Sequence, residues 1–109
     1  KKFHEFWIKR CDHVVAGYPT EKWDTYNNAI DNKIVDPCEN LWDRMYIWFD
    51  GKVNPCDADY KSLLSFGNVN ENSIKDVWSN NTIMKLRKDH LENNRKKHNP
   101  CDKCGVTFC

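Results

Sequence analysis

The cysteines constrain this chain of 109 residues more than any other feature. Cys101 and Cys104 are separated by two residues, and Cys38 and Cys56 flank a segment that contains a glycine-marked hairpin. A two-residue gap lets a tight loop turn both sulfurs inward, and two more cysteines carried by a hairpin can close the far side of the same small cavity. Neighbouring thiolates need a cation, so this pattern predicts a metal pocket. Spacing alone leaves zinc and an iron-sulfur cluster both open.

Size and charge narrow the class of protein. The length fits one modest domain, and a domain this small buries only roughly two thirds of its unfolded surface, so a bound metal would add useful stability. The net charge is +1 with 30% charged residues. Phosphate-binding surfaces normally carry a clear excess of clustered Lys and Arg. We therefore expect no nucleic-acid partner.

The sequence has no segment of the kind that enters a membrane or directs export. It lacks an apolar run of about eighteen residues, and its start, Lys1–Glu5, is polar. We therefore expect a cytoplasmic protein with no membrane partner. Thiols stay reduced in the cytosol, which favours metal binding or catalysis over disulfides for the six cysteines.

The chain divides into three predicted segments. Residues 1–17 are predicted to form a helix and then a short buried strand over Asp12–Gly17, because apolar residues at helical spacing precede an apolar run that ends in glycine. Residues 18–37 are rich in Asn, Asp, Lys and Thr and are predicted to be a linker. Residues 38–109 form the third segment, which holds the paired cysteines.

The third segment begins with a predicted hairpin. Arg44–Phe49 alternates in character, Asp50–Gly51 suits a two-residue primed turn with positive φ at both positions, and Lys52–Pro55 is the return strand. The hairpin would bring Cys56 back toward Cys38. Its aromatic residues are expected to lie in the core rather than on a substrate surface; they are Trp42, Tyr46 and Trp48.

Two amphipathic helices are predicted after the hairpin. Asn72 or Ser73 can cap the first, and Asn80 or Asn81 can cap the second. Their apolar stripes would consist of Ile74, Val77 and Trp78 in the first helix and Ile83, Leu86 and Leu91 in the second. The expected fold class is α+β: a short β-hairpin followed by two or three helices around a four-cysteine metal site.

The cysteines and their flanking residues together resemble the SPASM or Twitch auxiliary-cluster domain of radical S-adenosylmethionine enzymes. The resemblance runs in order through Cys38–Trp42, Ile47–Cys56, Gly67–Val69, Ser73–Trp78, Leu86–Arg87 and Cys101–Cys104. It covers roughly the last two thirds of the chain, and the ordered co-occurrence is far more specific than any single element. Residues 1–17 resemble the last helix and strand of the barrel core, which makes them a candidate remnant of an α/β barrel.

The resemblance implies one [4Fe-4S] cluster with four thiolate ligands, namely Cys38, Cys56, Cys101 and Cys104. Full SPASM domains hold two clusters and need about eight ligands, whereas this chain has six cysteines, as the single-cluster Twitch variant would allow. Cys109 is an outside candidate for the metal site. Cys11 is expected to be a small buried apolar group, and Gly51 a turn position rather than a ligand.

The family also implies a role. Such clusters serve electron transfer or substrate positioning, and the substrate could be a peptide or a sugar-like small molecule. No Cys-x3-Cys-x2-Cys motif for the cluster that cleaves S-adenosylmethionine occurs here, so this piece alone is expected not to be catalytic. S-adenosylmethionine and a second cluster would belong to the barrel domain of the same parent chain.

Other interpretations remain open at this point. The main alternative is a zinc-binding four-cysteine module with a structural or interaction role and no redox function. An enzyme that uses Cys11 as its nucleophile ranks last, because no base is arranged near it in the sequence. The basic run Arg95–Lys97 is expected to solvate a helix end. The histidines are expected to be ordinary surface or core residues; they are His4, His13, His90 and His98.

Overall fold

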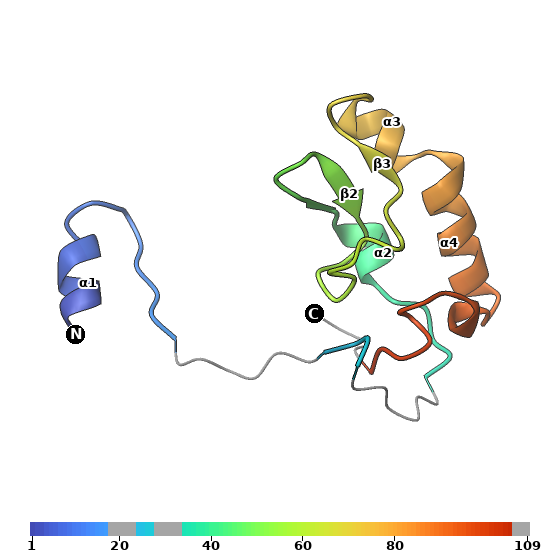
Figure 1. Ribbon diagram of the computed structural model, residues 1–109, viewed down its shortest axis with the longest axis horizontal. Helices are drawn as coiled ribbons and strands as arrows, with labels where there is room; N and C mark the ends of the chain where they lie inside the picture. The colour runs from blue at the N-terminus through green and yellow to red at the C-terminus, as the bar shows by residue number, and fades with distance from the viewer. Residues whose placement is uncertain (18–23, 28–33, 106–109) are drawn as a thin grey trace.

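The computed structural model describes residues 1–17, 24–27 and 34–105. Its strands form one antiparallel sheet in the order β1-β2-β3 and comprise β1 (Tyr46–Ile47), β2 (Lys52–Asn54) and β3 (Gly67–Asn68). Its helices are α1 (Lys2–Trp7), α2 (Asn40–Asp43), α3 (Ile74–Trp78), α4 (Asn81–Leu91) and the 3-10 helix η1 (Arg95–Lys97). Helices α2, α3 and α4 gather around the small sheet (Figure 1). This arrangement confirms the α+β fold class.

The predicted hairpin is present, but its turn is different. Strands β1 and β2 pair in antiparallel register, with Tyr46 opposite Asn54. The Gly51 amide donates to the Trp48 carbonyl, and the Trp48 amide donates to the Lys52 carbonyl, each at 2.9 Å. Gly51 has a positive φ of +85°, whereas the φ of Asp50 is not positive. The predicted two-residue primed turn is therefore wrong. A three-residue loop that ends in a left-handed glycine reverses the chain while Asp50 keeps an ordinary backbone conformation.

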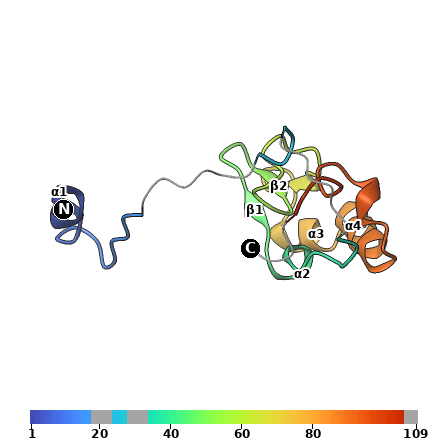
Figure 2. The same ribbon diagram turned by 90° about the horizontal axis from the view of Figure 1, so that it is seen from below.

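A third strand and a compact core complete the sheet region. Strand β2 pairs with β1 along one edge (Figure 2) and with β3 along the other (Figure 1), where Gly67 lies opposite Val53. A Cβ on Gly67 would lie 2.9 Å from Val77 Cγ1, so the absence of a side chain lets β3 approach α3 closely. The core residues come from α2, β2, α3, α4 and the segment before β3, and are Leu41, Val53, Phe66, Val77, Ile83 and Leu86.

Each of the two predicted helices begins at one of its two candidate capping residues, Ser73 for α3 and Asn80 for α4. The Ser73 side chain accepts a hydrogen bond from the Asp76 amide, and the Asn80 side chain accepts one from the Ile83 amide, each at 3.1 Å. The apolar stripes are narrower than predicted, because Ile74 is 57% exposed and Leu91, the last residue of α4, is 64% exposed. The core therefore takes one residue from α3 and two from α4.

The N-terminal segment contains the predicted helix but no strand. None of the residues of α1 is buried, and the helix stands apart from the other elements (Figure 1). Over Asp12–Gly17 the structure shows no strand, and Val15 is 74% exposed, so the predicted buried strand is wrong. An apolar run this short needs a neighbouring strand to pair with, and residues 1–17 have none in the described part of the chain.

Residues 24–27 contact the loop that follows β2. The Tyr60 hydroxyl donates to Asp24 Oδ1 at 2.7 Å, and the Tyr26 hydroxyl donates to the buried carboxylate of Asp59. This part of the predicted linker is thus fastened to the domain. The three-segment division itself stays a prediction. Among the described residues, no helix has the length and apolar character needed to cross a membrane.

Candidate metal centre

One pocket brings together side chains from three distant parts of the chain. All four predicted ligands line it, and they are Cys38, Cys56, Cys101 and Cys104. Most of its other lining is apolar and comes from Leu41, Pro55, Ala58 and Pro100, whereas its polar lining comes from Asn40, His90 and Arg95. The structure therefore places the four sequence-predicted site residues around a single pocket with few polar groups.

Local structure explains how each cysteine reaches the pocket. Cys38 lies at the entry to α2, where its carbonyl accepts a hydrogen bond from the Leu41 amide at 3.2 Å. Cys56 lies two residues after the end of β2, on the return side of the hairpin as predicted. Beyond η1, the segment that carries the last two cysteines folds back from α4 (red in Figure 1), and the Cys104 amide donates to the Cys101 carbonyl at 3.4 Å. This turn is what a two-residue gap makes possible.

The thiols influence one another electrostatically. Burial raises the pKa of Cys56 to about 12, and the charges of Cys104 and Cys38 contribute to that rise. Burial also raises the pKa of Cys101, to which the charge of Cys56 adds, while the positive charge of Arg95 opposes the rise. Without a bound cation these thiols therefore stay protonated. A metal must displace those protons when it binds.

The donor set is one that metals bind. Thiolates are ligands of both zinc and iron-sulfur clusters, and four of them match one zinc ion or one [4Fe-4S] cluster. Within residues 1–17, 24–27 and 34–105, no three His, Cys, Asp or Glu side chains form a group that could hold a metal ion. The four cysteines around the pocket are therefore compatible in type and number with either cofactor.

His90 is a pocket residue that the sequence did not single out. Its side chain is fully buried, with 0% exposure, and its Nδ1 accepts a hydrogen bond from the Cys38 amide at 3.3 Å. Burial, followed by the positive charges of Arg95 and His98, lowers the pKa of His90 to about 4. The ring is therefore neutral at pH 7. Sequence spacing could not reveal this contact, which joins residues 52 positions apart.

Arg95 is a buried cation beside the cysteines. Its side chain is only 1% exposed, and its guanidinium donates to the Asp36 carbonyl and to the Cys104 carbonyl, each at 3.3 Å. The expectation that the whole run Arg95–Lys97 solvates a helix end is therefore wrong for Arg95, although Lys96 and Lys97 are exposed. A buried guanidinium partly offsets the negative charge that bound thiolates would bring into the pocket.

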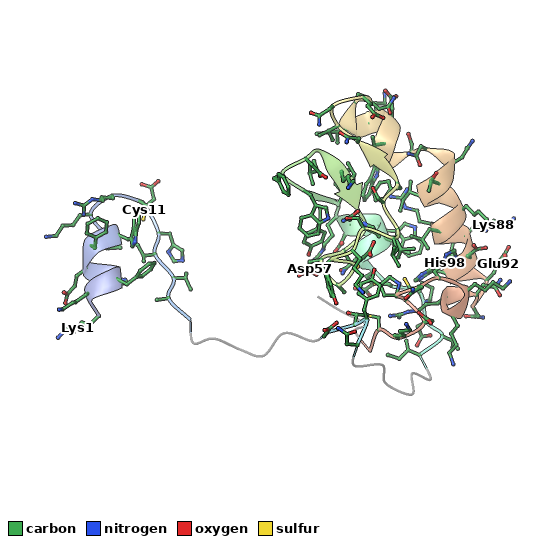
Figure 3. All side chains as sticks on the ribbon, viewed as in Figure 1. Lys1, Cys11, Asp57, Lys88, Glu92 and His98 are labelled. Atoms are coloured by element: carbon green, nitrogen blue, oxygen red, sulfur yellow. The ribbon has the colours of Figure 1, made fainter. Side chains whose placement is uncertain are left out.

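The remaining candidate residues lie elsewhere. Cys11 is exposed and its Sγ donates to the Trp7 carbonyl at 3.2 Å, so the prediction that it is buried is wrong. Cys11 lies beside α1, away from the sheet region (Figure 3). Cys109 lies outside the described residues. The three aromatic residues predicted for the core do not line this pocket. The prediction is wrong for Trp42, which lies in α2 and is 40% exposed, while Tyr46 and Trp48 are partly buried.

Comparison with protein families identifies the class. The SPASM family, an iron-sulfur cluster-binding domain, matches residues 38–105. The chain therefore belongs to the SPASM family of iron-sulfur cluster-binding domains, which confirms the family prediction. The matched region contains all four cysteines of the pocket.

One curated relative is similar to half of this chain. The S-adenosyl-L-methionine-dependent 2-deoxy-scyllo-inosamine dehydrogenase of Niallia circulans is 35% identical over 55 residues. That similarity spans 50% of this chain and 22% of the relative, so most of the relative has no counterpart here. No solved structure matches the chain.

Proposed function

We propose that this chain binds one [4Fe-4S] cluster through the thiolates of Cys38, Cys56, Cys101 and Cys104. The observation that carries the proposal is the single pocket that all four side chains line. Family membership supplies the iron-sulfur chemistry, and four cysteines match the ligand number of one such cluster. Cys109 is not needed for a complete ligand set under this proposal.

We further propose that the cluster is the auxiliary cluster of a radical S-adenosylmethionine enzyme. The S-adenosylmethionine dependence of the curated relative supports this parent class. The barrel domain, which binds S-adenosylmethionine and its own cluster, would belong to the same parent chain, with residues 1–17 at its end. A cytoplasmic setting would keep the thiols reduced, as ligand formation requires.

The role that suits this ligand set is electron transfer. A cluster with four thiolates has no open iron for a substrate, so it supplies one-electron transfer. The chain's own contribution is to exclude water with the apolar lining, hold the thiolates in place and offset their charge with Arg95. Of the two substrate classes, the relative's name favours a sugar-like small molecule over a peptide.

Anaerobic reconstitution with iron and sulfide tests this function. We expect about four irons and four sulfides per chain, with broad visible absorption that dithionite bleaches. Cys56→Ser and Cys101→Ser should each lower the iron content sharply. Cys11→Ser is the matched control, because Cys11 is exposed and does not line the pocket, and it should retain full iron content. A colourless protein that holds one zinc per chain would overturn the proposal in favour of the zinc module.

A further inference from the structure

We propose that His90 donates a hydrogen bond from its Nε2–H to a sulfur of the bound cluster and thereby raises the cluster's reduction potential. The inference rests on the proposed function, because it needs a cluster in the cysteine pocket. It assigns a specific role to a residue that is not one of the four proposed ligands.

The hydrogen bond from Cys38 fixes which nitrogen of His90 carries the proton. A backbone amide can only donate, so Nδ1, which lies 3.3 Å from the Cys38 nitrogen, must be the acceptor. In a neutral imidazole the other nitrogen then carries the hydrogen. His90 therefore presents Nε2–H as a donor, while the amide of a cluster-ligand candidate orients its ring.

The donor has no partner among the residues that the structure describes. Nε2 is buried and makes no hydrogen bond with any described residue, although the ring lines the same pocket as the four cysteines. Nearly all buried donors in folded proteins find an acceptor, and one left unmet calls for an explanation. Thiolate and sulfide sulfurs are the acceptors that a cluster would bring into this pocket.

His98 lies next to His90 but outside the pocket. The two rings are stacked with 6.2 Å between centroids and 28° between planes, and Nε2 of His98 lies 2.9 Å from Asp89 Oδ2. His98 does not line the cysteine pocket, so it can serve as a nearby control position.

A hydrogen bond to cluster sulfur favours reduction. Reduction adds negative charge to the iron-sulfur core, so a donor interacts more strongly with the reduced state than with the oxidised state. Hydrogen bonds to the sulfurs are among the factors that set cluster potentials. Loss of the donor should therefore lower the potential without removing any ligand.

Two substitutions with side chains of different length test the roles of the two ring nitrogens of His90 separately. Asn side chains end near the position of Nδ1 and can accept from the Cys38 amide, whereas Gln side chains place an N–H near the position of Nε2. In potentiometric titrations of the reconstituted full chain, we expect His90→Asn to lower the ratio of reduced to oxidised cluster about tenfold at a fixed solution potential, equivalent to about 59 mV. His90→Gln should stay within about twofold of the wild type.

The controls decide between a specific and a general effect. His98→Asn should leave the potential unchanged, because its ring lies outside the pocket. A wild-type potential in His90→Asn would overturn the proposal, as would equal losses in His90→Asn and His90→Gln. Equal losses in His90→Asn and His98→Asn would also overturn it, because they would indicate a general effect of helix-end packing.

A spectroscopic measurement keeps the proposal testable if His90→Asn loses its cluster. Reduced wild-type protein with 15N-labelled histidine should show a weak nitrogen coupling to the cluster in pulsed EPR, and His90→Gln should abolish that coupling. No coupling, or one as strong as that of a coordinated nitrogen, would overturn the hydrogen bond. Failure of the wild-type chain to assemble any cluster would instead overturn the proposed function, so the two failures are distinguishable.

Discussion

Asp59 stabilises the loop that follows Cys56, one of the four cysteines of the pocket. Its buried carboxylate accepts hydrogen bonds from the Leu63 amide at 2.9 Å and from the Leu64 amide at 2.7 Å, in addition to the bond from the Tyr26 hydroxyl. One side chain thus supplies acceptors for two backbone donors and ties residues 24–27 to the domain. The position of Cys56 depends on this loop, because it begins at that residue.

Asp59→Ala should therefore destabilise the protein substantially. We expect a loss of about 3 kcal/mol in the free energy of unfolding, because the two part-buried amides and the Tyr26 hydroxyl lose their acceptor. Urea denaturation measures the effect. Asp57→Ala is the control: Asp57 is exposed on the same loop (Figure 3), and the change should cost under about 0.5 kcal/mol. Equal effects of the two variants would contradict the role of Asp59.

Arg95→Met should weaken the cysteine turn and cluster binding together. The change removes the donors to the Asp36 and Cys104 carbonyls and the positive charge that favours thiolate at Cys101. We expect lower iron content after reconstitution and a loss of about 2 kcal/mol in stability. The exposed neighbour provides the control, since Lys96→Met should leave iron content unchanged. Full iron content in Arg95→Met would show that the guanidinium is dispensable.

For single residues, the sequence predicts which side chains are reactive better than it predicts which residues surround them. The four cysteines could be named because thiolates recur at informative spacings. His90 and Arg95 could not, because their pocket positions depend on contacts with residues far away in sequence, such as Cys38 and Asp36. Cys11 was expected to be buried by analogy with typical cysteines, but α1 offers it no core to enter.

The β1-β2 hairpin depends on a glycine at its turn. Gly51 has φ of +85°, and a Cβ there would lie 2.3 Å from Asn70 Nδ2. Gly51→Ala should therefore cost about 1–2 kcal/mol from the left-handed conformation alone, with further loss from displacement of Asn70. Thermal unfolding measures this loss of stability. For Gly17→Ala we expect no measurable change, because nothing lies within 4 Å of the added methyl group. A neutral Gly51→Ala would rule out the observed turn.

The predictability of each element follows from how local its determinants are. The hairpin and α4 carry turn, cap and periodicity signals in their own residues, so the sequence predicted them. Strand β3, with two residues, and helix α2, with four, are too short for such signals and depend on packing against β2 and the core. No strand forms over Asp12–Gly17, because its apolar residues meet no partner strand in the described part of the chain.

The described residues form a domain to which residues 24–27 are hydrogen-bonded, and an N-terminal helix, α1, without buried residues. Deletion of residues 1–17 should leave the urea midpoint and the iron content of the reconstituted protein unchanged, because α1 contributes nothing to the core. Deletion of residues 1–27 should lower the urea midpoint, since it also removes the Asp24 and Tyr26 contacts with Tyr60 and Asp59. Equal midpoints in the two truncations would contradict the fastening role of residues 24–27.

The pocket draws its sulfurs from near the start of the domain and from its last turn. An inorganic core bound there would act as a cross-link between ends of a long loop, and such closure restricts an unfolded chain more as the loop lengthens. Exposure to air, which attacks iron and sulfide, would open that link and release the tail after η1. Copies damaged by oxygen would then offer proteases a loose end that intact copies conceal.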